Sequence, residues 1–318
     1  MDMHPKKGSS RLLTFSCMNT TIYALGIPEN HHHIVRESFI RAEDILSRFK
    51  SNSELSQLNR TKNVPFIGSN ILFESIKTAD FHYDLTDGIY NPYMGKQLSS
   101  LGYNCSFEEI HKPAINHHHI TPSYFHEKVQ LDTKMKIITI TDDIQIDLGG
   151  IAKGWTAQCI ADLLKKEHKI TDGALIAGGD ICVWGTEKQN RKIVLNHPDT
   201  NAIPLYSFHL IKDAGVATSS IKKRSWTSDN GDSYHHILNP QTGLPAASDL
   251  IQATIIAPTL TEAEILTKCL LILGWEDGNN LCSKTSIPYV AIALSQDGEI
   301  MITEDKYSYT SEGVKKNE

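Results

Sequence analysis

The stretch KIITITDDIQIDLGGIAKGWTAQCIADLLKK, residues 136–166, carries the clearest structural pattern of this chain. Alternating apolar residues predict strands over 136–141 and 144–147, joined as a hairpin over Asp142 and Asp143. The apolar residues then change to helical spacing, which predicts a helix over about 153–166. A hairpin directly before a helix departs from the regular strand–helix alternation of a doubly wound sheet and favours an α+β fold.

The segments on both sides extend the same mixed pattern. We predict strands over 12–25, 174–183, 192–195, 206–211 and 250–257, helices over 31–49, 55–58, 69–82 and 261–273, and a final hairpin of 289–295 with 299–303. The polar, His-rich stretch 101–130 is interpreted as a surface excursion. Since no linker or repeat interrupts the pattern, we expect a single domain over 12–305, with flexible tails at 1–11 and 311–318.

Composition and charge narrow the possible functions. The chain has 318 residues, of which 40% are hydrophobic and 21% charged, and this excludes a disordered or collagen-like chain. Its net charge of −6 offers no basic field for a phosphate backbone, so we expect no nucleic-acid partner. No apolar run approaches about 18 residues, so we expect no membrane span. Six scattered cysteines and a short N-terminal apolar run favour a cytoplasmic location.

The junction between the second predicted strand and the helix is the first candidate site. Asp147 and Lys153 flank the pair Gly149-Gly150. Paired glycines let the backbone approach a ligand closely, and a helix N-terminus attracts anions. A tight turn alone explains the glycines but not the two flanking charges, so we favour a ligand-binding role.

Two further segments have a functional and a structural interpretation. His236 lies in the stretch 235–243, where it is either a general base or part of an ordinary loop. Residues 214–220 are small and rich in hydroxyls. They are interpreted as a loop, which either lies against a phosphate or is a plain turn at a strand end.

The last candidate lies at the start of the helix predicted over 261–273. Thr261 and Glu264 have the spacing of a capping box, so Glu264 could simply cap this helix. Glu264, Thr267 and Lys268 also lie at i, i+3 and i+4, on one helix face, where they could meet an ion or a phosphate. Both interpretations stay open at this point.

Taken in order, these segments resemble the ApbE-like flavin transferases, a family of FAD:protein FMN transferases. Its DxGGxAKGxA loop is similar to residues 147–157, its GGD strand end to 178–180, its ATSG loop to 217–220 and its HIxDPxTGxP loop to 236–245. Upstream, 47–59 resembles FSxxxxxSELSxLN, 86–92 resembles TDGAFDP, and 18–20 stands where the family has MGT. The resemblance is collinear from about residue 15 to 305.

The resemblance implies a T-fold-like α+β domain with antiparallel sheets and packed helices. It also implies FAD as substrate and Mg²⁺ as cofactor. Such enzymes transfer FMN from FAD to a Thr or Ser hydroxyl of a client protein, through a phosphoester bond, and release AMP. The sequence identifies neither the client protein nor the oligomeric state. Two alternatives remain: an FAD pyrophosphatase that produces FMN and AMP, and a flavin-binding protein that has lost turnover.

The resemblance also assigns roles to individual residues. The flavin or adenosine would be lined by Met18, Ile89, Tyr90 and Asn91, and FAD would also be contacted by Asp147, Lys153 and Thr218. The metal would be bound by the Gly150 carbonyl, Glu264 and Thr267. His236 would lie beside the reacting phosphate or the incoming hydroxyl.

The chain departs from the family pattern at its metal-binding helix. The family reads A-D-x-x-x-T there, whereas residues 263–268 read AEILTK. Glu264 thus replaces an Asp and Lys268 replaces a Thr; elsewhere Asn91 replaces an Asp and Ser220 a Gly. An ammonium beside Mg²⁺ is electrostatically unfavourable. Lys268 therefore either points away from the ion or takes over part of its role as a phosphate clamp.

Overall fold

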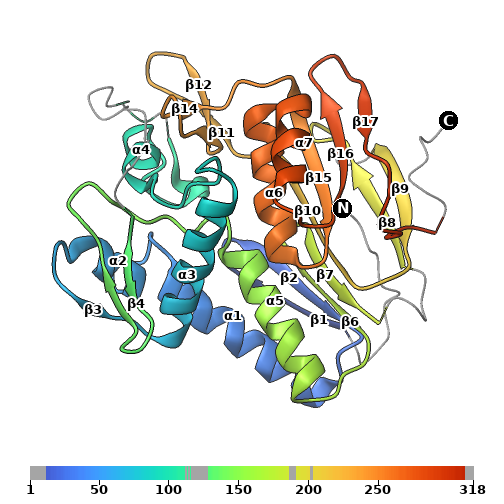
Figure 1. Ribbon diagram of the computed structural model, residues 1–318, viewed down its shortest axis with the longest axis horizontal. Helices are drawn as coiled ribbons and strands as arrows, with labels where there is room; N and C mark the ends of the chain where they lie inside the picture. Colours follow the sequence, from blue (N-terminus) through green and yellow to red (C-terminus); the bar gives the residue numbers. More distant parts are fainter. Residues whose placement is uncertain are drawn as a thin grey trace. The chain divides into compact units, whose positions relative to one another are not determined.

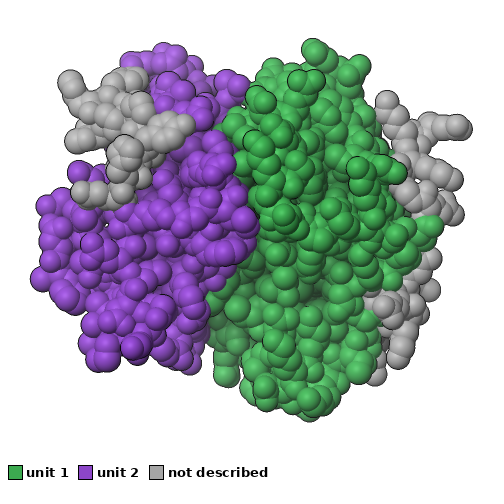
Figure 2. Space-filling view, viewed as in Figure 1, with its two compact units in different colours: residues 1–40, 153–223, 248–318 green, residues 41–152, 224–247 purple. Residues whose placement is uncertain are grey.

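The chain divides into two compact units, which are coloured separately in Figure 2. The computed structural model describes residues 12–111, 113, 115, 128–185, 191–200 and 203–311. Unit 1 comprises residues 1–40, 153–223 and 248–318, and unit 2 comprises 41–152 and 224–247. The single domain expected over 12–305 thus contains two units that alternate along the sequence. Except for Ser311, the expected tails lie outside the described residues.

Unit 1 is built on an eight-stranded sheet in the order β1-β2-β6-β7-β10-β15-β16-β17 (Figure 1). All neighbours in this sheet are antiparallel. The strands are β1 Leu12–Cys17, β2 Thr20–Leu25, β6 Gly173–Ala177, β7 Asp180–Trp184, β10 Ala214–Ser220, β15 Leu250–Ala257, β16 Val290–Ser295 and β17 Ile300–Ile302. The antiparallel sheet with packed helices confirms the α+β class.

Helices and a separate two-stranded ribbon pack against this sheet. On one face, Phe39 of α1 (His32–Leu46) contacts Phe15 of β1, and α6 (Leu260–Leu273) packs on β10 and β15. Gln158 of α5 (Ala152–Lys166) accepts hydrogen bonds from the Cys182 thiol and Leu260 N. The ribbon of β8 (Arg191–Asn196) and β9 (Pro204–Leu210) shares a hydrophobic core with the central strands. α7 (Trp275–Lys284), which the sequence pattern did not predict, packs on α6.

Two segments predicted as single strands are hairpins. Within 12–25, Met18 and Asn19 both have φ 53° and connect β1 to β2. Within 174–183, Gly178 and Gly179 have φ 67° and 97° and connect β6 to β7. Positive φ at both central residues is the geometry of the two-residue turn that matches strand twist. Met-Asn lacks the usual Asn-Gly signature, so the pattern concealed the first turn.

Two other expectations were wrong. Residues 214–220, expected to form a loop, are the strand β10, which lies between β7 and β15. The hairpin predicted over 136–147 does not form. Its first half, β5 (Ile137–Thr139), pairs instead with β3 (Phe66–Ile67) and β4 (Gln130–Asp132). Its second half makes only an isolated bridge from Gln145 to Met94. The strands that pair with β10 are distant from it in sequence, and so is β3 from β5, whereas β4 directly precedes β5 and forms a hairpin with it.

Unit 2 combines short helices with small sheets. Its helices are α2 Glu54–Arg60, α3 Asn70–Leu85, α4 Gly95–Ser100 and the 3₁₀ turn Phe107–Glu109, and it also holds the end of α1; its further strands are β11 Ser225–Thr227, β12 Ser233–His235, β13 Leu238–Asn239 and β14 Leu244–Pro245. Leu101 and Tyr103 are buried with Trp226 and Tyr234, so part of the expected surface excursion belongs to the core. Among the described residues, no helix is long and apolar enough to cross a membrane.

Candidate active site

The first part of the candidate site lies in unit 1, at the start of α6. Thr259 caps this helix: its side chain accepts a hydrogen bond from Glu262 N, and the Glu262 carboxylate accepts one from Thr259 N. This reciprocal pair is a capping box two residues earlier than the spacing of Thr261 and Glu264 suggested. Glu264 therefore does not cap the helix, and the structural interpretation of this residue was wrong.

Glu264 is instead buried against the first turn of α5. Its side chain is 2% exposed, and Oε2 accepts a hydrogen bond of 3.0 Å from Gly154 N. A Cβ at position 154 would lie 2.4 Å from that oxygen, so a larger residue would displace the carboxylate from this contact. Because the first N–H groups of a helix have no intrahelical partner, a carboxylate at this place satisfies one of them.

Two ammonium groups lie beside the same carboxylate. Lys153 Nζ and Lys268 Nζ are each 3.7 Å from Glu264 Oε1. Lys268 Nζ also donates a hydrogen bond of 3.0 Å to the main-chain oxygen of Glu264. Lys268 therefore points toward the carboxylate that was predicted to bind the ion.

Asp180 is a fourth charged group near these three, and the site prediction had not included it. Its Oδ1 accepts a hydrogen bond of 2.8 Å from Thr218 N, and Thr218 Oγ1 lies 2.9 Å from Thr254 Oγ1. Burial, and then the negative charge of Glu264, raise the pKa of Asp180 to about 6, against the lowering effect of both lysines. We call Lys153, Asp180, Glu264 and Lys268 the charge cluster. The GGD motif contained the signal for Asp180.

The charge cluster does not fit a divalent cation. Mg²⁺ bound to Glu264 Oε1 at about 2.1 Å would lie within about 6 Å of both ammonium groups. At an effective dielectric constant of about 20, each lysine would then repel the ion by more than about 5 kcal/mol, and the two together would offset most of the roughly 16 kcal/mol by which the Glu264 carboxylate attracts it. Among the described residues, no group of three or more His, Cys, Asp or Glu side chains could hold a metal ion.

A second predicted metal ligand, Thr267, does not improve the fit. Thr267 is fully buried, and its hydroxyl lies 2.6 Å from Ala263 O and 3.3 Å from Ala217 O. Its hydrogen is therefore directed to main-chain carbonyls. Gly150 belongs to unit 2, where it follows the turn formed by Asp147.

Asp147 organises the second part of the candidate site, in unit 2. Its carboxylate pairs with Arg48 Nε and accepts a hydrogen bond of 2.7 Å from Gly149 N. Arg48 also donates to Tyr103 O at 2.6 Å and lies over the rings of Phe49 and Tyr103. Asp147, predicted to contact FAD, thus holds the Gly149-Gly150 turn in place. Arg48 was not among the predicted site residues, although the motif at 47–59 contains it.

The structure distinguishes the two neighbouring histidines of unit 2. His235 Nε2 lies 3.1 Å from Ala246 O, and burial lowers the pKa of this imidazole. His236 is half-buried, its Nδ1 is 3.4 Å from Arg224 O, and its ring centroid is 6.5 Å from that of Tyr103. His236 therefore remains the candidate for proton transfer.

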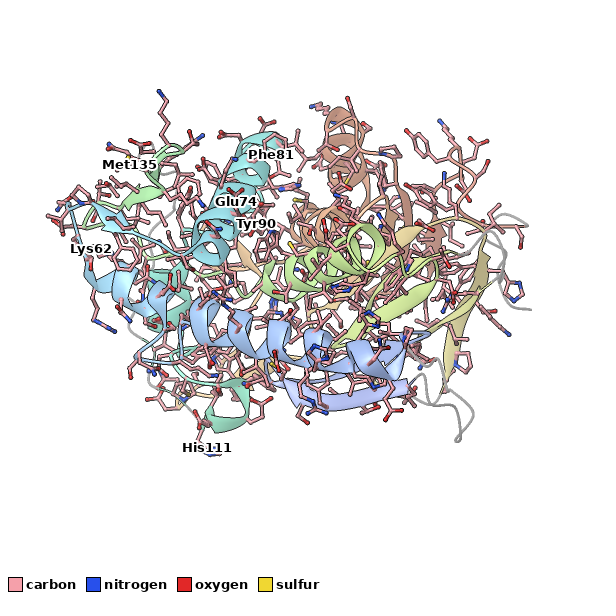
Figure 3. The ribbon with its side chains drawn as sticks, turned by 90° about the horizontal axis from the view of Figure 1, so that it is seen from below. Lys62, Glu74, Phe81, Tyr90, His111 and Met135 are labelled. Atoms are coloured by element: carbon pink, nitrogen blue, oxygen red, sulfur yellow. The ribbon has the colours of Figure 1, made fainter. Side chains whose placement is uncertain are left out.

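The residues predicted to line the flavin or adenosine belong to different units. Ile89, Tyr90 and Asn91 follow α3 in unit 2; Figure 3 labels Tyr90. Ile89 and Tyr90 are buried, and Asn91 Oδ1 accepts a hydrogen bond of 2.8 Å from Tyr93 N. Met18 lies in the β1–β2 turn of unit 1. The three consecutive residues 89–91 thus lie together in unit 2, and Met18 belongs to unit 1.

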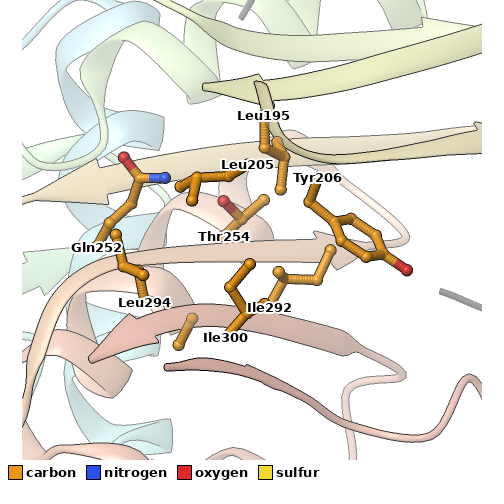
Figure 4. Close-up of a pocket in the computed structure, with 9 residues that line it drawn as sticks. Leu195, Leu205, Tyr206, Gln252, Thr254, Ile292, Leu294 and Ile300 are labelled. Carbon is orange, nitrogen blue, oxygen red and sulfur yellow. The ribbon is translucent and has the colours of Figure 1, made fainter. Parts of the chain in front are cut away.

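An apolar pocket in unit 1 is too small to be the site. Figure 4 shows aliphatic side chains and Tyr206 lining it. Its lining residues are Leu195, Leu205, Tyr206, Gln252, Thr254, Ile292, Ala293, Leu294 and Ile300. The cavity volume is about 10 Å³, roughly what one water molecule requires.

The raised pKa of Asp180 predicts a pH dependence of stability. The folded protein binds the proton of the Asp180 carboxyl more tightly than the unfolded chain does. The stability that this proton contributes is therefore present below the ordinary pKa of 3.8 and is lost as the pH rises through about 6. We expect the free energy of unfolding of the wild type to fall by up to about 3 kcal/mol, relative to that of Asp180→Asn, between pH 4 and 6.5. Urea unfolding across this range measures the difference. Asp297→Asn, at an exposed turn, is the control; a pH-independent difference would contradict the prediction.

The chain is similar to known proteins in both sequence and fold. A model described as the ApbE family matches residues 17–291. The FAD:protein FMN transferase of Vibrio cholerae is 25% identical over 261 residues, which are 80% of this chain and 77% of that protein. The one from Treponema pallidum is 26% identical over 250 residues, with 74% and 68% covered.

Solved structures of the same family share the fold. The crystal structure of the ApbE protein from Thermotoga maritima superposes with a TM-score of 0.81 at 24% identity, covering 95% of this chain and 99% of that one. The flavin transferase ApbE from Vibrio cholerae superposes with a TM-score of 0.73 at 21% identity, covering 92% and 97%. At these identities the superpositions show the fold alone.

Proposed function

The chain belongs to the ApbE family, and on that premise we propose that it transfers FMN from FAD to a Thr or Ser hydroxyl of another protein. The observation that carries the proposal is the match of the family over residues 17–291, which includes the segments of Asp147, Lys153, Thr218 and His236. The names of the relatives from Vibrio cholerae and Treponema pallidum support it. The client protein is the expected partner.

The proposed reaction is a phosphoryl transfer. The client oxygen forms a bond to the phosphorus of the FMN moiety, and the bond between this phosphorus and the bridging oxygen of FAD breaks, so that AMP leaves. We assign acceptance of the hydroxyl proton to His236, because imidazole is the side chain that most often serves as a general base. Lys153 would offset negative charge on the diphosphate. Magnesium, which the resemblance implies, does not enter this proposal because the charge cluster does not fit it. A cytoplasmic location remains a prediction.

Mass spectrometry of a candidate acceptor protein incubated with this chain and FAD tests the proposal. We expect the acceptor to gain the mass of FMN less one water at a Thr or Ser, with AMP released. We expect His236→Gln to lower the rate at least about a hundredfold, because general acid–base catalysis contributes on that order. His168→Gln, at an exposed histidine of unit 1, is the control and should label normally.

The same experiment separates the alternatives. FMN and AMP formed at a useful rate, with no labelled protein in several acceptors, would overturn transfer in favour of an FAD pyrophosphatase, in which water replaces the client hydroxyl. Bound FAD without cleavage would indicate a flavin-binding protein that has lost turnover.

A further inference from the structure

The two lysines of the charge cluster come from different helices and meet at one carboxylate. Lys153 lies in the first turn of α5 and Lys268 in the second half of α6. Their side chains are 14% and 15% exposed, whereas Glu264 between them is 2% exposed. Burying long cationic side chains to this degree is unfavourable unless they are paired. The charges of Lys153 and Lys268 therefore interact more strongly with their neighbours than the charge of an exposed lysine does.

Lys268 is held at this place by two contacts. Its ammonium donates to the main-chain oxygen of Glu264 at 3.0 Å and lies 3.7 Å from the carboxylate of the same residue. A Thr at position 268, as in the family pattern, would bring a neutral hydroxyl there. The substitution thus places an ammonium group on the helix turn that resembles the family's metal-binding segment.

The charges of the cluster balance without any added ion. Asp180 and Glu264 contribute two negative charges when ionised, and Lys153 and Lys268 contribute two positive charges. In the FAD-free protein, a divalent cation would therefore leave two positive charges in excess in a largely buried place. An approaching anion, in contrast, meets two partly exposed ammonium groups, each with three N–H donors.

We propose that Lys268, together with Lys153, replaces the divalent cation in this chain, so that the diphosphate of a dinucleotide is bound by two ammonium groups with no metal ion at α6. The ligand class is an organic diphosphate, and FAD is its member under the proposed function, on which this part of the inference rests. The statement about the metal concerns the protein alone and does not depend on FAD.

Calorimetric titration of the FAD-free protein with Mn²⁺ tests the inference directly. We expect no saturable binding by the wild type at millimolar Mn²⁺. We expect Lys268→Thr, and the double variant Glu264→Asp with Lys268→Thr, to gain one saturable site, because only Lys153, which the family motif also contains, then remains beside a carboxylate that accepts a hard cation. Lys165→Thr is the matched control: this lysine also lies on a helix 3.1 Å from a carboxylate, that of Asp162, and should behave like the wild type.

FAD binding in EDTA is the second readout, followed by flavin fluorescence. The wild type should bind FAD without metal. Lys268→Thr and Lys268→Gln should bind it at least about tenfold more weakly, and Mn²⁺ should restore binding to Lys268→Thr. Thermal melts in the same buffers show whether each variant is folded.

The outcomes separate the two proposals. One-to-one Mn²⁺ binding by the wild type, or wild-type FAD binding that requires metal, would overturn the inference. Failure of the wild type to bind FAD in either buffer would overturn the proposed function, whereas the Mn²⁺ titration would still decide whether lysines have replaced the ion.

Discussion

Arg48→Ala is expected to destabilise unit 2 by about 3–5 kcal/mol, because it leaves the Asp147 carboxylate buried without its ion pair. The Arg48 side chain is 6% exposed and that of Asp147 is 13% exposed. The substitution also removes the hydrogen bond to Tyr103 O and the contacts with the rings of Phe49 and Tyr103. Since Asp147 holds Gly149 N, the turn that carries Gly150 should loosen as well.

Thermal unfolding measures this effect, and a Tm decrease of about 10 °C is expected from the usual relation of Tm to stability. Arg60→Ala is the control in the same unit. Arg60 is exposed and donates one hydrogen bond, to Ser51 O, so its loss should change Tm by little more than about 1 °C. A Tm of Arg48→Ala within about 2 °C of the wild type would show that the buried pair does not hold unit 2 together.

Gly215→Ala is expected to have an effect of similar size in unit 1. A Cβ at this position would lie 2.2 Å from Leu260 N and 2.4 Å from the carbonyl carbon of Thr259. Both atoms belong to the main chain, which cannot move aside as a flexible side chain does. β10 is paired on both edges, with β7 and with β15, so the strand cannot shift either. The start of α6, and with it Glu264, should therefore be displaced.

Urea unfolding followed by circular dichroism should show a loss of about 3 kcal/mol or more for this variant. Gly298→Ala is the control: it lies at the β16–β17 turn with φ 85° and no heavy atom within 4 Å of an added Cβ. Its backbone strain alone should cost only about 1–2 kcal/mol. If Gly215→Ala proved no less stable than Gly298→Ala, close packing of β10 against α6 would not be what requires glycine here.

The candidate site shows how far the motifs alone could go. They identified Lys153 and Glu264, which the structure brings together, and they identified Asp147. They did not identify Asp180 or Arg48, although both lie in quoted motifs, because a motif does not show which of its charges are buried next to one another. Which charges become neighbours depends on contacts between segments that are distant in sequence. Asp180 of β7 is hydrogen-bonded to Thr218 of β10, and Arg48 pairs with Asp147, about a hundred residues further along the chain.

The sequence by itself determined the long helices and the family. The helices predicted over 31–49, 153–166 and 261–273 are observed as α1, α5 and α6, because helical periodicity arises from contacts within about four residues. The order of the motifs indicated the ApbE family, which the family match confirms.

Only the tertiary structure decided the rest. β10 consists mostly of small residues, of which only Val216 and Thr218 favour a strand, and it is a strand because β7 and β15 satisfy its backbone on both edges. The cap of α6 lies at Thr259 instead of Thr261 because the helix begins where the chain leaves β15. Lys153 faces Glu264 because α5 and α6 meet there, and the low dielectric of a buried contact strengthens the interaction between these charges.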